Sequence, residues 1–550
     1  MPMRWILGGI LGVALVLRLA GVTYGLPLDV MGDEFVHLFT AFTMLDEMTL
    51  RVLSPLSYVP SLFAILTVPF IAAFGALGIV FGTFEGIAGF KEFAVINATD
   101  FLSIGRVLSA LFGVAFIYLL YRIVRPLAGV WPALVVAAFA ALDFWLVHES
   151  NRAHFWMPAT TLLALAFYTL IRMAETGRPK YYWASVVSIS FAFWMGFFPI
   201  LLTPFFVLAH FHAQGRTFKP LIYPGAALLG FIMIISWLNP LSVFKQFGRA
   251  IRSILNVVGI DVLEQFGGPS DKATEPFQNL YFLFRTLIVD NPLMFVLGAV
   301  GLVLIAYNVG WRSIVVQLTL GFFVLYIAIA MFVWPHPDYR YMLPLLLPLL
   351  LGVAYAISVG YKKLHPRRSG VWVGAILLAL MFGYSIYTTT GYVTLLQKDD
   401  TRILAREWIF EHVPDSAAVY TSTYYFDLPK SREAIIFYKQ NLPEALRTKD
   451  DVLLGLPNER FPTPSYFVID IESAQKLGEK TPTFDYIVAG YFKPERRIAI
   501  PPGFKRITEF YPTDPGERID DLIQTPRNPF IAVESVSRLG PHIEIYKRLE

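Results

Sequence analysis

The chain has 550 residues, of which 56% are hydrophobic and only 16% charged, and its mean hydropathy is +0.56. Soluble domains average about 45–50% apolar and about 25% charged residues, so this composition excludes an ordinary soluble protein and indicates a membrane protein with a polar portion attached. The net charge of +4 without a long Lys/Arg tract argues against nucleic-acid binding, and the lack of cysteine excludes disulfides and thiolate metal sites.

Apolar stretches long enough to span a bilayer, about 20 residues each, recur over residues 1–391. The N-terminal stretch lacks a clear cleavage site, so we predict an uncleaved first helix. The stretch 181–211 is interrupted by "GFFP", which predicts a hairpin of two short helices. The other predicted spans are 4–25, 101–121, 127–147, 156–174, 221–238, 288–306, 313–334, 341–361 and 371–391.

The short loops rich in Lys and Arg indicate which ends of these helices face the cytoplasm. These loops can all be cytoplasmic only if the apolar stretch 57–80 makes no net crossing. We therefore predict that 57–80 is juxtamembrane or re-entrant and that about eleven transmembrane helices cross the bilayer. The alternative is that one helix is miscounted. The loops predicted to face outward are 26–100, 148–155, 239–287 and 335–340.

Residues 392–550 have a different character and are predicted to form a soluble α/β domain on the outer side. Residues 399–414 read as an amphipathic helix. Segments rich in β-branched and aromatic residues, bounded by Pro and Gly, predict strands. These segments are 417–423, 434–439, 465–471, 484–492, 531–536 and 543–549.

The first polar group in a predicted outer loop is Asp33-Glu34, followed by His37 one helical turn after Asp33. Ionisable side chains at a membrane face are costly unless they pair or function, which marks this group as a candidate site. The alternative is a solvated acidic loop.

A second outer loop, "LVHESNRAHFW", carries His148, Glu149, Arg152 and His154. This is a high density of ionisable residues for a helix hairpin, so we include Glu149 and Arg152 among the candidate substrate-binding residues. The alternative is a polar cap between two spans.

A third group, "WPHPDYRYMLP", places His336, Tyr339, Arg340 and Tyr341 at the outer mouth of a helix. Arginine suits phosphate through its planar donor fork. The alternative is that Tyr and Arg only anchor the helix at the interface.

The segment 243–255 repeats basic residues at helical spacing, including Arg249 and Arg252, and predicts an amphipathic helix on the outer leaflet. These arginines either hold a lipid phosphate or anchor the loop.

All four groups fall on one membrane face, although the charge rule that assigned the faces did not use them. Carboxylates beside cations at a membrane surface fit chemistry on an amphiphile with an anionic head group. A carboxylate can accept a proton from an attacking hydroxyl, and an arginine can stabilise a departing phosphate.

At these residues the chain resembles the polytopic GT-C fold glycosyltransferases of the glycosyltransferase family 39 type, in the branch with protein O-mannosyltransferases and the lipid A aminoarabinose transferase. The resemblance covers residues 1–391. It rests on Leu17-Arg18-Leu19, the pair Asp33-Glu34, "GRVLSALFG" at 105–113 and "YRYMLPLLLPLL" at 339–350. The "WWDYG" signature of oligosaccharyltransferases is absent, which disfavours transfer of a preassembled glycan to Asn.

The resemblance implies transfer of a sugar from a polyprenyl-phosphate carrier to an acceptor outside the cytoplasm, with inversion. Asp33 matches the catalytic carboxylate of the family, and Glu34 would support it. Arg340 and Tyr341 match the basic-aromatic pattern before the late helix, where phosphate contact is a hypothesis. The sequence predicts no cofactor, and the alternative is a divalent metal ion near Asp33 and Glu34.

Two other classes of protein remain as alternatives. A transporter or lipid-carrier flippase would carry ionisable groups near the bilayer midplane, often in repeated halves. Here the acidic groups cluster at one face, with Asp143 as the main exception. A sensor would use the membrane part only as an anchor, for which about eleven spans are excessive. The sequence thus favours a multi-pass enzyme of the plasma membrane or an equivalent membrane.

Overall fold

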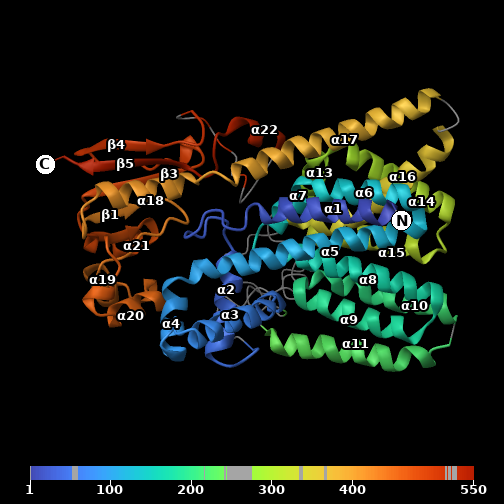
Figure 1. Ribbon diagram of the computed structural model, residues 1–550, viewed down its shortest axis with the longest axis horizontal. Helices are drawn as coiled ribbons and strands as arrows, with labels where there is room; N and C mark the ends of the chain where they lie inside the picture. The colour runs from blue at the N-terminus through green and yellow to red at the C-terminus, as the bar shows by residue number, and fades with distance from the viewer. Residues whose placement is uncertain are drawn as a thin grey trace, which may run out of the picture.

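The computed structural model describes residues 2–51, 60–215, 217–240, 243, 276–332, 338–364, 368–514, 517, 519, 522 and 529–549. A helical bundle occupies one end of the molecule and a smaller domain with a sheet occupies the other (Figure 1). In the described ranges, eight helices are long and apolar enough to cross a membrane, or nine if one bent pair counts as a span. The predicted polytopic membrane protein is thereby confirmed, while the count of eleven crossings stays a prediction.

The helices up to residue 395 follow the predicted order. They are α1 (Pro2–Leu19), α2 (Glu34–Asp46), α3 (Leu62–Val80), α4 (Gly86–Ile96), η1 (Ala98–Phe101), α5 (Leu102–Ala128), α6 (Val130–Leu142), α7 (Phe144–Ser150), α8 (Trp156–Thr176), α9 (Pro179–Gly196), η2 (Phe198–Leu202), α10 (Thr203–Gln214), α11 (Lys219–Leu238), α13 (Pro276–Asp290), α14 (Pro292–Val309), α15 (Ile314–Phe332), η4 (Tyr339–Met342), α16 (Leu343–Leu364) and α17 (Arg368–Leu395).

Two breaks shape the bundle. The helix pair α6 and α7 bends by 56° where a single span was predicted. The bend lies at Asp143, whose carboxylate accepts a hydrogen bond from the Leu146 N–H at 3.0 Å and so caps α7. The predicted interruption of 181–211 is confirmed. Helix α9 ends at Gly196, Phe197 has a φ of 58°, and α10 begins at Thr203.

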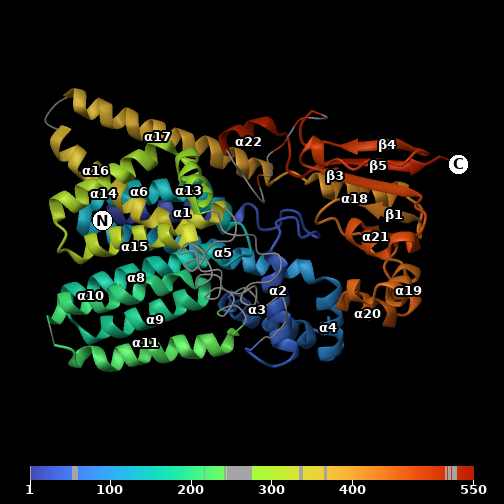
Figure 2. The same ribbon diagram turned by 180° about the vertical axis from the view of Figure 1, so that it is seen from behind.

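The stretch predicted to make no net crossing forms helix α3, which is long and apolar enough to span a membrane by length and composition. Helices α2, α3 and α4 gather at the end of the bundle nearest the smaller domain (Figures 1 and 2). This position agrees with a juxtamembrane role for α3, which stays a prediction.

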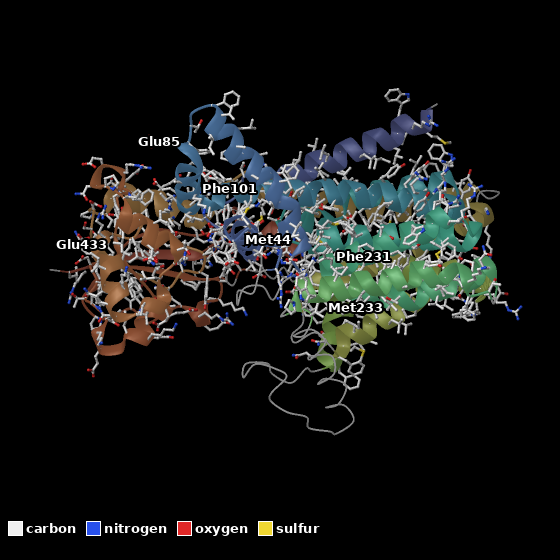
Figure 3. The ribbon with its side chains drawn as sticks, turned by 90° about the horizontal axis from the view of Figure 1, so that it is seen from below. Met44, Glu85, Phe101, Phe231, Met233 and Glu433 are labelled. Carbon is white, nitrogen blue, oxygen red and sulfur yellow. The ribbon has the colours of Figure 1, made fainter. Side chains whose placement is uncertain are left out.

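The bundle packs tightly inside and is apolar outside. A Cβ on Gly301 would lie 1.8 Å from the carbonyl oxygen of Gly352, so α14 and α16 approach through small residues, as membrane helices often do. Phe231 and Met233 of α11 project from the outside of the bundle, whereas Glu433 projects from the smaller domain (Figure 3). The apolar exterior fits contact with lipid.

The smaller domain confirms the predicted α/β class. Its helices are α18 (Thr401–His412), α19 (Arg432–Asn441), α20 (Thr448–Gly455), α21 (Ile471–Leu477) and α22 (Pro529–Ser535), with short η5 (Pro443–Ala445), η6 (Asn458–Arg460), η7 (Gly478–Lys480) and η8 (Pro494–Arg496). Its strands are β1 (Ala418–Thr421), β2 (Phe467–Asp470), β3 (Tyr486–Tyr491), β4 (Phe504–Phe510) and β5 (His542–Arg548), in the order β2-β1-β3-β5-β4. β1 pairs in parallel with β2 and β3, and β5 pairs antiparallel with β3 and β4.

Two predicted strands are wrong. Residues 434–439 belong to α19, whose Ser431 side chain caps the first turn and whose buried Ala434, Ile435 and Tyr438 share one face. Residues 531–536 belong largely to α22, which packs on α17 with Phe530 stacked on Tyr384. In both segments the burial of one helical face outweighs β propensity. The strand β4 was not predicted.

The domain docks on the loop that follows α1. The Tyr24 hydroxyl donates to Asp400 at 2.7 Å, and Arg460 forms an ion pair with Glu92 of α4. One hydrophobic cluster contains Val30 from this loop and Val419 from β1. The start of the chain and the sheet are thus parts of one packed structure.

Candidate active site

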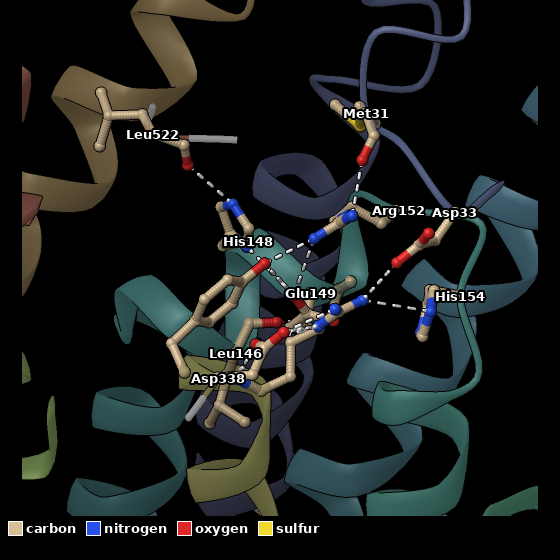
Figure 4. Close-up of polar contacts among 12 residues, drawn as sticks. Met31, Asp33, Leu146, His148, Glu149, Arg152, His154, Asp338 and Leu522 are labelled. Carbon is tan, nitrogen blue, oxygen red and sulfur yellow. Dashed lines mark hydrogen bonds and ion pairs between the residues drawn. The ribbon is translucent and has the colours of Figure 1, made fainter. Parts of the chain in front are cut away.

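The site centres on Asp33, which directly precedes α2. Asp33 has a φ of 60°, a left-handed conformation that short polar residues tolerate better than others. Its Oδ2 accepts a hydrogen bond from Arg340 Nη1 at 3.0 Å (Figure 4). The predicted acidic and basic elements, 307 residues apart in the chain, therefore lie in contact.

Arg340 is fixed by a second carboxylate. Its Nε donates to Asp338 Oδ1 and Oδ2 at 3.1 and 3.0 Å, and its Nη2 donates to Oδ2 at 2.6 Å. The Nη1 arm points to Asp33 and lies 3.5 Å from His154 Nε2. Asp338 thus holds one edge of the guanidinium and leaves the other edge toward Asp33.

Arg152 holds the loop that carries Asp33. Its Nη2 donates to the backbone carbonyls of Met31 and Gly32, and its Nη1 donates to the Tyr339 hydroxyl. That hydroxyl in turn donates to Glu149 Oε1 at 2.9 Å. The buried network of Arg152, Tyr339 and Glu149 therefore fixes the backbone just before Asp33 (Figure 4).

Glu34 behaves differently from its neighbour. Its side chain is fully buried, whereas that of Asp33 is 45% exposed. Glu34 accepts two hydrogen bonds from Arg106, at 3.0 and 2.7 Å, and a third from the Ala153 N–H. This carboxylate joins α2 to α5 and to the loop before α8. Its hydrogen bonds therefore hold these segments in position.

His37 and His154 form a buried pair beside Asp33. Their rings meet edge to face at 5.1 Å, and His37 also contacts Phe63 and Phe155. Neither nitrogen of His37, nor Nδ1 of His154, has a hydrogen-bond partner among the described residues. Burial lowers the pKa of His37 to about 4 against the opposing charge of Asp33, so His37 is neutral at physiological pH. Neutral imidazoles can both donate and accept hydrogen bonds.

The electrostatics of the site keep Asp33 ionised. Burial favours its neutral form, but the positive charges of Arg340 and Arg152 outweigh that effect and hold its pKa below the usual value. Four residues earlier, burial and the charge of Glu34 raise the pKa of Asp29 to about 7. Two nearby carboxyl groups therefore have opposite protonation tendencies.

The structure describes one of the four remaining predicted site residues. Tyr341 lies on η4 with its ring centroid 5.5 Å from that of Trp156. His336, Arg249 and Arg252 lie outside the described residues. Among the residues that the structure describes, no group of three or more His, Asp or Glu side chains is placed to hold a metal ion.

The sequence assigned no role to Arg106, Asp338 or His154. Arg106 had a usable signal, because a lone charged residue in an apolar helix must find a partner. Asp338 and His154 stood in the polar groups noted above. Only the three-dimensional structure shows that Arg106 contacts Glu34 and that Asp338 and His154 contact Arg340.

Comparisons with known proteins find a family match over part of the chain. The family model described as dolichyl-phosphate-mannose-protein mannosyltransferase matches residues 92–239. That range includes Arg106, Glu149 and Arg152. No curated protein matches the sequence.

Solved structures resemble the chain at low identity. The apo oligosaccharyltransferase of Archaeoglobus fulgidus is 12% identical with a TM-score of 0.49, covering 89% of this chain and 69% of that one. ArnT from Cupriavidus metallidurans bound to undecaprenyl phosphate is 14% identical with a TM-score of 0.48, covering 89% and 93%. The S. cerevisiae Pmt1-Pmt2 complex bound to the sugar donor is 17% identical with a TM-score of 0.31, covering 47% and 34%.

The family match and the polytopic helical architecture agree with the resemblance drawn from the sequence. The expected likeness to protein O-mannosyltransferases is thereby confirmed over residues 92–239.

Proposed function

We propose that this chain is a membrane glycosyltransferase that moves a sugar from a polyprenyl-phosphate-linked donor to an acceptor hydroxyl outside the cytoplasm. The observation that carries the proposal is the 3.0 Å contact between Asp33 and Arg340 beside a buried neutral histidine. The family match supports a lipid-phosphate sugar as the donor.

Asp33 acts as the general base. The acceptor oxygen attacks the anomeric carbon, the bond from that carbon to the phosphate oxygen breaks, and Asp33 takes the hydroxyl proton. The polyprenyl phosphate leaves with the bonding electrons, and a single displacement inverts the anomeric centre. A positioned base contributes about 10²–10⁴-fold to rate.

Arg340 binds the donor phosphate. Asp338 occupies its Nε and Nη2, so Nη1 is the arm that donor oxygens can reach. Nη1 carries two N–H groups, so a phosphate oxygen at Nη1 shares the positive charge of this arm with Asp33. Donor binding therefore weakens the hold of Arg340 on Asp33 and makes the carboxylate a stronger base.

Glu34 and Arg152 are positioning residues. Glu34 with Arg106 sets the start of α2, and Arg152 fixes the carbonyls of Met31 and Gly32. The histidine pair offers unpartnered nitrogens for sugar hydroxyls or phosphate oxygens. We further propose that the site and the smaller domain face the extracytoplasmic side, since the charge rule assigns both to that face.

The test measures sugar transfer by the purified full chain in lipid nanodiscs, with a panel of radiolabelled polyprenyl-phosphate sugars and an extract of cell-envelope glycans and proteins. We expect one donor to release its polyprenyl phosphate and label an acceptor. Asp33→Asn should abolish this transfer. The matched control is Asp46→Asn, since Asp46 lies exposed at the other end of α2.

The control should retain wild-type transfer. The proposal is contradicted if no donor in the panel is consumed, or if Asp33→Asn transfers sugar at the rate of Asp46→Asn.

A further inference from the structure

The loop after β1 carries two adjacent exposed tyrosines of the smaller domain. Tyr424 is 68% exposed and Tyr425 is 43% exposed. Phe426 and Leu428, the next apolar residues, are buried and anchor the loop. Tyr425 has a φ of 57°, which is rare for a bulky residue. Residues held in such strained conformations by the surrounding structure are often found at functional sites.

The loop leaves the sheet at a position where open α/β sheets commonly bind ligands. From β1 the chain runs to β2 on one side of the sheet, and from β3 it runs to β4 and β5 on the other. The carboxyl ends of β1 and β3 are therefore a topological switch point, where open α/β sheets bind ligands.

The same end of the sheet is built for close approach. The Ser422 N–H donates to the Val488 carbonyl of β3 at 3.0 Å, which continues the pairing past the end of β1. A Cβ on Gly490 would lie 2.4 Å from Thr423 Oγ1, so only glycine at this place in β3 lets the loop lie so near. The backbone that leads into Tyr424 is thus held against β3.

The smaller domain packs against the loop before Asp33. Tyr24 of that loop donates to Asp400 just before α18. Arg106 donates both to the Tyr24 carbonyl and to Glu34, the residue after Asp33. Burial and then the charges of Asp33 and Asp29 raise the pKa of Tyr425 to about 12. This shift agrees with the packing of the smaller domain against the loop before Asp33.

We propose that Tyr424 and Tyr425 bind the acceptor, and that this acceptor is a glycan or glycolipid that presents a sugar hydroxyl to Asp33. The inference rests on the proposed function and assigns the acceptor side of the same site to the smaller domain. A tyrosine offers an apolar ring face and a polar hydroxyl, and a sugar ring offers the matching apolar C–H face and hydroxyl edge.

The sheet favours a glycan over an extended peptide. Peptides commonly bind such domains by adding a strand to an exposed sheet edge. β1 is an interior strand, with β2 on one side and β3 on the other, so the loop that carries the two tyrosines leads from no free edge.

The experiment measures binding to the full chain in lipid nanodiscs by saturation-transfer NMR. The probes are alkyl glycosides of mannose, glucose, galactose and arabinofuranose and one Ser/Thr-rich hexapeptide. We expect at least one glycoside to bind and its Kd to rise at least tenfold in Tyr424→Ala and in Tyr425→Ala. Ile436→Ala is the control, because Ile436 is similarly exposed on α19 of the same domain.

Two further variants separate this inference from the proposed function. Tyr425→Phe keeps the ring and should bind the glycoside within about threefold of wild type. Asp33→Asn should also keep glycoside binding, even though it loses transfer. If Asp33→Asn transfers sugar but the tyrosine variants lose glycoside binding, the proposed base is wrong and the acceptor assignment stands.

Three results would overturn the inference. The first is glycoside binding that is equal in wild type and in both tyrosine-to-alanine variants. The second is no binding of any glycoside in the panel. The third is binding of the hexapeptide, in place of the glycosides, that depends on the two tyrosines.

Discussion

Replacing Glu34 by Gln is expected to destabilise the protein strongly, while Asp33→Asn leaves its stability almost unchanged. Glu34 is fully buried and accepts hydrogen bonds from Arg106 and from the Ala153 N–H. Removing one partner of a buried ion pair costs about 3–5 kcal/mol, because the other charge stays buried without compensation. Asp33 is 45% exposed, and such pairs contribute about 0.2–1 kcal/mol.

The assay unfolds the purified protein with SDS and monitors the unfolding by circular dichroism. The thermal unfolding midpoint is measured as well, in one detergent. Glu34→Gln should lower the free energy of unfolding by about 3–5 kcal/mol. Asp33→Asn should lower it by less than about 1 kcal/mol. The double variant Glu34→Met/Arg106→Met should be more stable than Glu34→Gln, because it removes both buried charges.

The opposite pattern would refute this reasoning. If Glu34→Gln unfolds like wild type and reduces sugar transfer as much as Asp33→Asn does, both carboxylates belong to the reacting centre. The buried contacts of Glu34 with Arg106 would then not be its main role.

The remaining predictions concern three side chains. Arg340→Ala should weaken donor binding by about 10- to 100-fold, because a hydrogen bond to a charged group is worth about 1.5–3 kcal/mol; unchanged donor affinity would assign the phosphate contact to another cation. His37→Phe should keep the unfolding midpoint but lower turnover, and wild-type turnover would remove His37 from substrate binding. The raised pKa of Asp29, about 7, means that the folded protein releases this proton at higher pH than the unfolded chain does. Stability should therefore fall between about pH 4 and pH 7, by up to about 1.4 kcal/mol per pH unit, and an equal slope in Asp29→Asn would contradict this.

The sequence predicted the membrane class, and it singled out Asp33 and Arg340, which the structure brings into contact, because both predictions depend on composition and local pattern. Apolar runs and basic loops are read directly from the chain, and an acidic pair in a predicted outer loop stands out against them. The "GFFP" interruption likewise predicted the break between α9 and α10.

The division of roles within the acidic pair could not be read from the sequence. Asp33 and Glu34 are adjacent and chemically alike, and they differ only because α2 directs one carboxylate to Arg106 and the other to Arg340. The position of Tyr425 relative to Asp33 depends on how the smaller domain docks on the helical bundle. No local sequence pattern predicts that docking. β propensity also misassigned residues 434–439, where burial of one face of α19 decides the structure.

The most direct test of the account measures donor binding and sugar transfer together in Asp33→Asn. In the proposed mechanism Asp33 and the donor phosphate share Arg340 Nη1, so removing the charge of Asp33 should leave donor affinity equal to or tighter than wild type. Transfer should fall by at least about 10²-fold, since the proton acceptor is lost. Transfer at the wild-type rate, or a parallel loss of donor binding, would contradict the central claim that Asp33 is the base and Arg340 the phosphate contact of one site.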